Sequence, residues 1–321
     1  ADLAAVLGLP KDRLRVIQAE TGGGFGGKLD LSVQLFCALA AYHLQRPASL
    51  VYSREESFQA TGKRHPLVMD YTTGADKDGN LTACKVEIVG DTGAYASYAL
   101  AVCTRAAVHA CGPYRVPNAQ VLSRVVYTNN PWCGAMRGFG VPQVAVAHEG
   151  QMDALAHQLG LDPLDIRLKN ALREGDTTIT GQKMGPGTAL AQCLQAVEPY
   201  FRDYQGRKSP APGQVPGAGV GAMFYGIGNT AMSNPSTAKV QISGEGDLLL
   251  FTGAADIGQG SDTVLTQIAA ESLGWDYHKV KLFRGDTANS DSAGATSASR
   301  QTFISGNAVV SACENLKEML L

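Results

Sequence analysis

The sequence predicts an α+β protein in which helices pack on mixed β-sheets. Two strand-like stretches between positions 67 and 89 flank the turn sequence DKDGN at residues 76–80, whose Asp-Gly step is typical of a hairpin. Apolar helical patterns begin at Pro142 and Pro163, and proline suits the first turn of a helix. A strand, a hairpin and a helix are predicted again after residue 219, so a second unit of strands and helices is expected to begin there.

The first half of the chain contains most of these predicted elements. A strand at residues 14–18 precedes a glycine loop at 22–28, and a helix over 31–44 follows with Asp30 as its N-cap. Further strands are expected after the hairpin, as far as residue 127. Helices are then expected over 142–159 and 163–172.

A stretch rich in proline and glycine separates the two halves. Residues 206–218 have the composition of a linker, which divides the chain into a first domain, 1–205, and the start of a second domain, 219–321. The second domain is predicted to contain a strand at 220–225, a hairpin around 244–247, a helix over 261–273 and a final helix from 301. That helical pattern still continues at residue 321, so we expect the chain to be a fragment.

Composition limits the classes of partner. The 321 residues are 45% hydrophobic and 17% charged, as in soluble globular proteins. A net charge of −2 gives no basic field for nucleic acid or an anionic membrane surface. Since we find neither an apolar run of roughly 18 residues nor a cleavable leader, a cytoplasmic location is expected.

The seven cysteines include no Cys-x-x-Cys pair. Their odd number and irregular spacing disfavour a disulfide framework, a zinc site and an iron–sulfur site. An iron–sulfur centre, if the protein moves electrons through one, is therefore expected on another chain or segment.

Three glycine-rich loops suggest a ligand. They are GGGFGGK at 22–28, RGFGVPQ at 137–143 and IGQGS at 257–261, each followed by a predicted helix. Glycine lets the backbone approach a ligand closely, and the N–H groups at a helix N-terminus attract anions. The loops together predict an anionic, phosphate-bearing cofactor.

Two nucleotide-binding motifs match the first loop imperfectly. A P-loop requires Ser or Thr after its lysine to bind magnesium, and Leu29 cannot do so. The acidic residue of a Rossmann unit is expected about 20 residues later at a strand end, where this sequence predicts a helix instead. Ordinary structural turns remain an alternative for this loop, and a P-loop nucleotidase is a distant one.

Taken in order, the motifs resemble the molybdenum-cofactor subunit of the xanthine dehydrogenase and aldehyde oxidoreductase family. The resemblance covers nearly all of the chain, and residues 71–143 resemble bacterial xanthine dehydrogenases, including selenium-dependent ones. The matching segments are residues 23–28, 53–56, 90–95, 113–118, 128–131, 137–143, 258–260 and 306–308.

This resemblance implies a molybdopterin-binding domain of the molybdenum hydroxylase type. The cofactor is expected as molybdopterin or as its cytosine dinucleotide, with iron–sulfur clusters and FAD on other domains or subunits. Phe25, Arg137 and Ala298 would lie beside the metal, with Phe25 and Ala298 offering backbone amides. The matching positions for cofactor binding are Gly24, Phe25, Gly26, Arg137, Gly258, Gln259, Gly260, Ser261, Ala298 and Ser299.

The resemblance also implies substrate residues. Phe139 and Phe224 match two phenylalanines that enclose a flat heterocycle, and Arg105 matches an arginine that contacts purine carbonyls. The alternatives are core phenylalanines and a structural ion pair. Two positions depart from the purine enzymes: Leu29 replaces a substrate-facing glutamate, and Tyr225 stands where a small hydroxyl residue is expected.

The function expected from these residues is hydroxylation of an aromatic N-heterocycle such as a purine, with hydride transfer to the molybdenum centre. The protein would be a molybdenum-dependent, xanthine dehydrogenase-like oxidoreductase that works with iron–sulfur and flavin components. Alternatives are an aldehyde oxidoreductase of the same fold and a non-catalytic cofactor-binding or assembly module. The family's catalytic glutamate lies in a Gly-Val-Gly-Glu motif that nothing in this chain matches, so no catalytic residue is predicted within it.

Overall fold

The computed structural model describes residues 2–321, and these residues form two compact units. Unit 1 consists of Ala1–Lys63, Gly134–Arg137 and Gly226–Leu321, of which Ala1 lies outside the described residues. Unit 2 consists of Arg64–Cys133 and Gly138–Tyr225. The units group residues by packing, and the division in chain order at residues 206–218 stays a prediction.

Unit 2 is built on a three-stranded mixed sheet. Strands β1 (Leu67–Ala75) and β2 (Leu81–Asp91) pair antiparallel, and β3 (Ala119–Val126) pairs parallel to β2. The carboxylate of Asp76 accepts the backbone N–H groups of Asp78 and Asn80, each at 2.9 Å, in the turn between β1 and β2. The predicted hairpin is therefore confirmed: Asp76 stabilises the turn, and Gly79 of the Asp-Gly step provides its positive φ of 82°.

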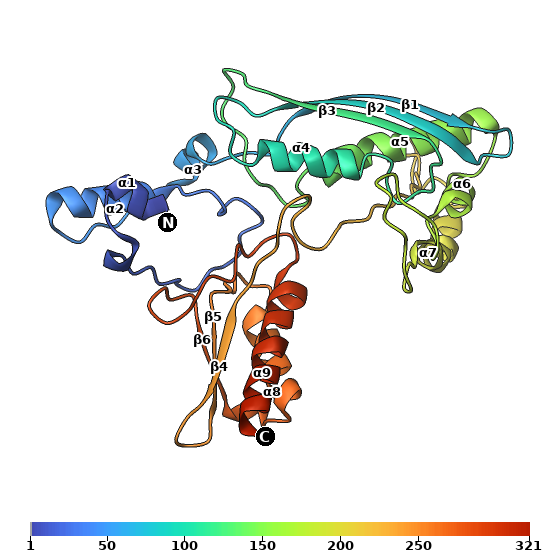
Figure 1. Cartoon of the computed structure of the whole chain (residues 1–321). Helices are drawn as coiled ribbons and strands as arrows, with labels where there is room; N and C mark the ends of the chain where they lie inside the picture. The colour runs from blue at the N-terminus through green and yellow to red at the C-terminus, as the bar shows by residue number, and fades with distance from the viewer. Residues whose placement is uncertain (1) are drawn as a thin grey trace. The chain divides into compact units, whose positions relative to one another are not determined.

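Four helices complete unit 2. Helices α4 (Ala99–Val108) and α5 (Val141–Leu159) lie along one face of the sheet (Figure 1). Helices α6 (Pro163–Asn170) and α7 (Leu190–Gln205) pack on each other beyond α5. Alternate residues of β2 face this helical layer, and the buried core includes Cys84, Val86, Ile88, Ala106, Ala110, Val144, Met152 and Ile166.

Unit 1 contains a second three-stranded sheet. Strands β4 (Ala238–Ile242) and β5 (Leu248–Thr252) pair antiparallel, and β6 (Val280–Arg284) pairs parallel to β5. Helices α8 (Ser261–Leu273) and α9 (Gly306–Leu320) pack on each other and on this sheet. Its buried core includes Leu248, Leu250, Leu265, Ala269, Val309 and Cys313.

Short helices make up the rest of unit 1. The N-terminal segment contains α1 (Asp2–Leu7), η1 (Lys11–Arg13), α2 (Val33–Leu44) and α3 (Arg54–Ala60). Ser53 and Glu56 form a reciprocal capping box at the start of α3. The remaining elements are η2 (Tyr277–Lys279) and a π-helical turn η3 (Gln301–Ser305) that leads into α9.

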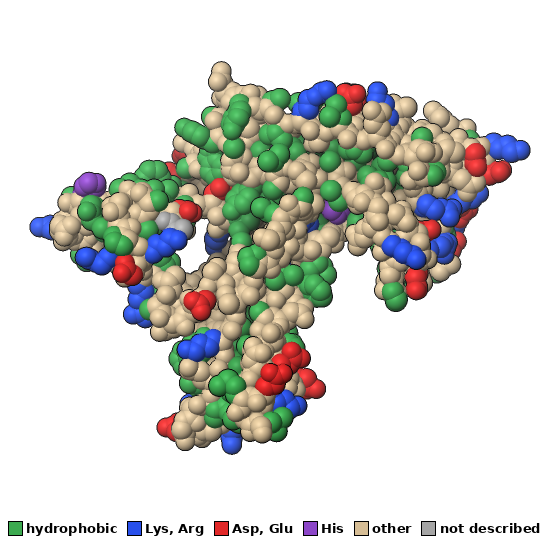
Figure 2. Space-filling model, in the orientation of Figure 1, with side chains coloured by type: hydrophobic (Ala, Val, Ile, Leu, Met, Phe, Trp, Pro, Cys, Tyr) green, Lys and Arg blue, Asp and Glu red, His purple; other side chains and the backbone are tan. Residues whose placement is uncertain are grey.

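The two units share one topology. In each, an antiparallel hairpin is followed by a helix, by a third strand parallel to the second, and by a further helix. Their mixed sheets with packed helices confirm the α+β class. On the face shown in Figure 2, basic and acidic side chains are interspersed, in keeping with the near-neutral net charge.

Several element predictions were wrong. Residues 14–18 make a single bridge, between Ile17 and Asp286, instead of a strand, and residues 220–225 are irregular. Residues 99–108 form α4 instead of a strand, since alanine-rich sequence favours helix. Helix α2 begins at Val33 with Ser32 at its N-cap, so Asp30 does not cap it.

Candidate functional site

Three turns in the chain have the same backbone conformation. Residues 24–27, 138–141 and 297–300 each contain two central residues of positive φ, and each is closed by a backbone hydrogen bond of 3.0–3.1 Å from the fourth residue to the first. Positive φ at both central positions is the pattern of a type I′ turn. The first central residue is Phe25, Phe139 or Ala298, all of which the sequence analysis assigned to the site.

These turns impose strain on ordinary side chains. The φ angles are 51° at Phe25, 51° at Phe139, 53° at Ala298 and 54° at Ser299. A non-glycine residue in this region costs roughly 1–2 kcal/mol. Among residues 2–321, seven non-glycine residues have positive φ, and four of them are predicted site residues. Such strain persists where function requires a particular backbone direction.

The first turn is joined to the segment that contains Arg137. The Arg137 N–H donates to the Phe25 carbonyl at 2.9 Å, and the Arg137 guanidinium lies 5.7 Å from the centre of the Phe25 ring. A Cβ at Gly26 would lie 2.8 Å from the Ala135 carbonyl oxygen, so only glycine allows this approach. Both Phe25 and Arg137 are exposed.

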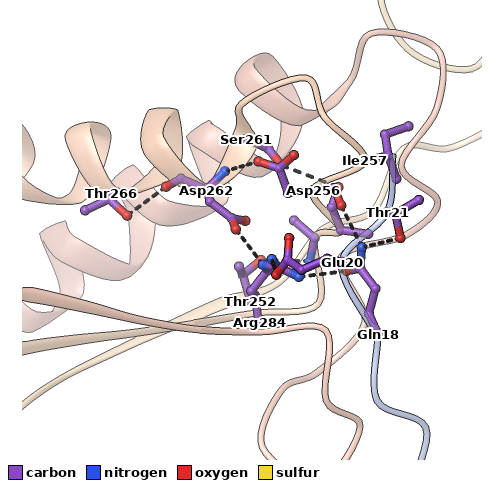
Figure 3. Close-up of polar contacts among 12 residues, drawn as sticks. Gln18, Glu20, Thr21, Thr252, Asp256, Ile257, Ser261, Asp262, Thr266 and Arg284 are labelled. Carbon is purple, nitrogen blue, oxygen red and sulfur yellow. Dashed lines mark hydrogen bonds and ion pairs between the residues drawn. The ribbon is translucent and has the colours of Figure 1, made fainter. Parts of the chain in front are cut away.

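The third glycine loop lies beside the first. A Cβ at Gly24 would stand 3.1 Å from the Ile257 side chain, and one at Gly258 would stand 4.0 Å from the Gly23 nitrogen. Gln18, just before the first loop, donates from Nε2 to the Asp256 carbonyl at 2.7 Å (Figure 3). Two segments more than 200 residues apart in sequence therefore meet within unit 1.

Asp256 fixes the third loop and was missed by the sequence analysis. Its carboxylate accepts the N–H groups of Gly258 at 2.8 Å and Asp262 at 3.0 Å. Burial alone would raise the pKa of Asp256, but these hydrogen bonds and one from Gly260 outweigh burial, and the pKa is lowered. An aspartate two residues before a Gly-x-Gly at a helix start is the sequence signal that could have identified it.

The side chain of Gln259 also acts within this loop. Its Oε1 accepts the Ile257 N–H at 2.7 Å, and its Nε2 donates to the Ser261 hydroxyl at 3.0 Å. Gly260, with a φ of 81°, is the N-cap residue of α8, and Ser261 is buried. The Gln259 side chain therefore links the start of the loop to the first residue of α8.

The Ala298 turn belongs to the same unit. The Ala298 carbonyl accepts the Gly228 N–H at 2.8 Å, and the Thr296 hydroxyl accepts the Ala255 N–H at 3.0 Å. Residues 296–298 thus lie beside the segment that leads to the third glycine loop. All ten predicted cofactor-binding residues lie in unit 1.

Helix N-termini follow two of the three glycine loops. Gly140 is the N-cap residue of α5 and Gly260 that of α8, as expected. The first loop does not lead directly into a helix, because a second turn intervenes, closed by the Leu29 N–H on the Gly26 carbonyl at 3.1 Å. The helix expected after this loop is α2, which begins at Val33, so its N-terminus is separated from the loop by the second turn.

The three predicted substrate residues lie in unit 2. Arg105 of α4 is buried, and its guanidinium lies 4.4 Å from the centre of the Tyr225 ring, within the range of a cation–π contact. The half-buried Phe224 packs on His109, with ring centres 4.6 Å apart. Phe139 packs edge-on against Tyr98 at 6.0 Å.

Burial sets the charge states around Arg105. Burial lowers the pKa of Arg105. It also lowers the pKa of His109, and the positive charge of the neighbouring Arg105 lowers the His109 pKa as well. The neutral imidazole of His109 can therefore stack on Phe224 without bringing a second positive charge beside Arg105. The cluster is cationic and aromatic at once, which suits a flat ring with electron-rich substituents.

Comparison with known proteins identifies the family. A molybdopterin cofactor-binding domain model matches residues 1–171, and a second molybdopterin cofactor-binding domain model matches residues 199–321. The chain belongs to the molybdopterin cofactor-binding domain family. The predicted recognition, the fold of the molybdenum hydroxylase type and the molybdopterin cofactor are thereby confirmed.

Relatives of this molybdopterin-binding chain are oxidoreductases by name. The nicotinate dehydrogenase large molybdopterin subunit of Eubacterium barkeri is 57% identical over 194 residues, which is 60% of this chain and 46% of the relative. The xanthine dehydrogenase molybdenum-binding subunit of Escherichia coli O157:H7 is 33% identical over 98% of this chain and 43% of the relative. The chain spans less than half the length of both relatives.

Solved structures share the fold. The aldehyde oxidoreductase from Desulfovibrio desulfuricans superposes with a TM-score of 0.89 at 31% identity, over 97% of this chain and 35% of that one. Quinoline 2-oxidoreductase from Pseudomonas putida superposes with a TM-score of 0.85 at 26% identity, over 99% of this chain and 43% of that one. Among residues 2–321, no helix combines the length and apolar character needed to cross a membrane.

The residues of unit 1 fit molybdopterin. Across the part of the chain that the structure describes, no internal acceptor receives the N–H of Phe25 or of Ala298, because the first central residue of such a turn directs its N–H away from the turn. A Cβ at Gly260 would meet nothing within 4 Å, so space remains at the α8 N-terminus. Backbone N–H groups and the Arg137 guanidinium form a donor set suited to an oxygen-rich anion.

Proposed function

We propose that this chain is the molybdopterin-binding part of a molybdenum hydroxylase that oxidises an aromatic N-heterocycle. The observation that carries the proposal is the strained backbone at Phe25, Phe139 and Ala298, the positions that family resemblance assigned to the site. A purely structural module would have no reason to keep phenylalanine or alanine where glycine is free of strain. The strain therefore favours a cofactor-binding role over a purely structural one, and turnover distinguishes the hydroxylase from a cofactor-binding module without activity.

The residues of unit 1 would bind and orient the cofactor. The N–H groups of Phe25 and Ala298 donate to its oxygen atoms, and the Arg137 guanidinium offsets negative charge beside them. Molybdopterin with its metal, when bound, supplies the two-electron oxidation of a C–H carbon. The hydrogen bonds within the loop before α8 would keep its donors in place and so lower the ordering cost of cofactor binding.

The residues of unit 2 would select the substrate. Phe139 and Phe224 contact the faces or edges of a planar ring, and Arg105 donates to a carbonyl or carboxylate on that ring. Leu29 offers no hydrogen bond to a purine, and a close relative is named for nicotinate, so we place a heteroaromatic carboxylate ahead of a purine. In this assignment Tyr225 holds the Arg105 guanidinium in place through its ring.

Aldehyde oxidation is the second candidate. It is supported by the TM-score of 0.89 against an aldehyde oxidoreductase. In either case iron–sulfur and flavin components would accept the electrons, and the catalytic glutamate would come from outside this chain.

The complete protein that carries this chain, purified from its native host, provides the test. Molybdenum analysis, fluorescence of the oxidised pterin and turnover with nicotinate, xanthine, quinoline and benzaldehyde are measured on one preparation. The proposal expects stoichiometric molybdenum and pterin with turnover of an N-heterocycle. Preference for benzaldehyde supports the second candidate, and folded protein from a cofactor-competent host without pterin rejects both.

The Arg105→Gln variant tests the substrate assignment. We expect roughly tenfold or greater loss of kcat/KM for a substrate with a ring carboxylate, since a charge-assisted hydrogen bond is lost. The loss of kcat/KM for quinoline, which has no carboxylate, should be smaller. Equal losses for both substrates would show that Arg105 acts structurally.

A further inference from the structure

The approach to the first glycine turn is fixed against the end of β6. The Gln18 N–H donates to the Gly285 carbonyl at 2.7 Å, and the Thr287 N–H donates to the Val16 carbonyl at 3.1 Å. A Cβ at Gly285 would lie 2.9 Å from the Gln18 Cβ, so glycine is required for this contact. The position of β6 therefore determines where the first turn begins.

Arg284, the last residue of β6, connects three segments at this point. Its Nε donates to Asp262 Oδ2 at 2.5 Å, one Nη donates to Glu20 Oε1 at 3.0 Å, and the other donates to Gln18 Oε1 at 3.3 Å. Figure 3 shows this guanidinium between the segment of Gln18 and Glu20 and the first turn of α8. The side chain is 16% exposed, so water competes weakly for these bonds.

The same contacts continue to the third glycine loop. Gln18 Nε2 donates to the Asp256 carbonyl, and the Asp256 carboxylate holds the N–H groups of Gly258 and Asp262. Arg284 therefore links the entry to the turn that contains Phe25 with the loop that precedes α8. None of the sequence motifs included Arg284, Gln18 or Asp256.

Building on the proposed function, we propose that Arg284 is a positioning residue for molybdopterin. It sets the spacing between two loops that must contact one cofactor, while its own contacts are with protein. Residues that hold ligand-binding groups in place in this way commonly change affinity by about 10–100-fold when removed. Arginine is suited to the task because its planar fork donates in several directions at once, which lysine cannot do.

The contacts of Arg284 are expected to contribute unequally to holding the two loops in place. Glu20 is 94% exposed, so its ion pair with Arg284 is screened by water and contributes little. Asp262 is 33% exposed and its contact is shorter, so it contributes more. Glu20→Gln should therefore retain molybdopterin like the wild type, and Asp262→Asn should retain an amount between those of the wild type and Arg284→Gln. Arg284→Lys should retain molybdopterin better than Arg284→Gln but less well than the wild type.

The test measures cofactor retention in the complete holoenzyme. Molybdopterin content after gel filtration, and the rate of its loss on dilution, are compared between wild type and Arg284→Gln. We expect loss about 10-fold faster in the variant. Lys281→Gln is the matched control, since Lys281 also lies on β6 and pairs with Asp247 of the β4–β5 hairpin; it should lose cofactor at the wild-type rate.

Hydrogen exchange separates positioning from general destabilisation. Arg284→Gln should speed exchange in residues 16–28 and 256–263 and leave β4 and β5 unchanged. Faster exchange throughout the sheet, or wild-type cofactor retention, would overturn the proposal. Wild-type protein without molybdopterin would instead overturn the proposed function, and unchanged exchange in the two loops would then still reject the role of Arg284.

Discussion

Phe25, Phe139 and Ala298 show how the site differs from the rest of the chain at the scale of single residues. Each occupies a conformation that glycine adopts without strain and that other residues rarely adopt. The sequence identified these residues only through family resemblance. Composition and spacing cannot reveal a positive φ at phenylalanine, because propensity predicts the opposite.

Replacing Phe25 by glycine should stabilise unit 1. The substitution removes the free-energy cost of the left-handed conformation. Because Phe25 is 62% exposed, loss of its side chain removes few packing contacts. After the added flexibility of the unfolded chain is subtracted, we expect the free energy of unfolding to rise by about 0.5–1 kcal/mol in denaturant titrations.

Phe36→Gly is the matched control, for which a change of stability in the opposite direction is expected. Phe36 is similarly exposed, at 60%, but lies within α2, where glycine weakens the helix. Its free energy of unfolding should fall by about 0.5 kcal/mol. If both variants shift the free energy of unfolding in the same direction, relief of strain at Phe25 does not explain the stability of Phe25→Gly.

At the scale of elements, local signals predicted the structure better than long-range ones. The hairpin between β1 and β2 and the bounds of α8 follow from turn and periodicity signals within a few residues. The parallel pairing of β2 with β3 depends on the crossover through α4, which no local pattern encodes. Residues 14–18 have strand-like composition but form a single isolated bridge, between Ile17 and Asp286, so no ladder extends from them.

The start of α5 permits a matched pair of glycine substitutions. A Cβ at Gly140 would lie 2.4 Å from the Val102 carbonyl oxygen, and φ there is 98°. Gly140→Ala should therefore lower the free energy of unfolding by about 2 kcal/mol or more, through clash and strain together. Thermal or denaturant unfolding of the variant measures this loss.

Gly150 in the same helix is the control. A Cβ there would meet nothing within 4 Å, and the backbone is helical. Gly150→Ala should raise stability by about 1 kcal/mol, because alanine is the better helix former. A neutral Gly140→Ala variant would mean that α4 moves away from the loop at no cost.

At the scale of the whole molecule, the two units repeat one topology and differ in what they contribute. The sequence predicted two α+β halves, but the repeated order of strands and helices is not accompanied by a repeat in the sequence. Many different apolar residues can fill the same core position, so two units can share a topology without sharing a sequence. The ten predicted cofactor-binding residues fall in unit 1, and Arg105, Phe139 and Phe224 fall in unit 2.

This partition predicts that two kinds of variant separate in their effects. Arg137→Gln in unit 1 should reduce molybdopterin content, because it removes a cation from the donor set around Phe25. Phe224→Ala in unit 2 should leave molybdopterin content at the wild-type level and raise KM by about tenfold, the effect of losing one aromatic contact of about 1.4 kcal/mol. Both quantities are measured on the purified holoenzyme. Loss of cofactor in Phe224→Ala, or a raised KM with full cofactor content in Arg137→Gln, would show that the units do not divide the work in this way.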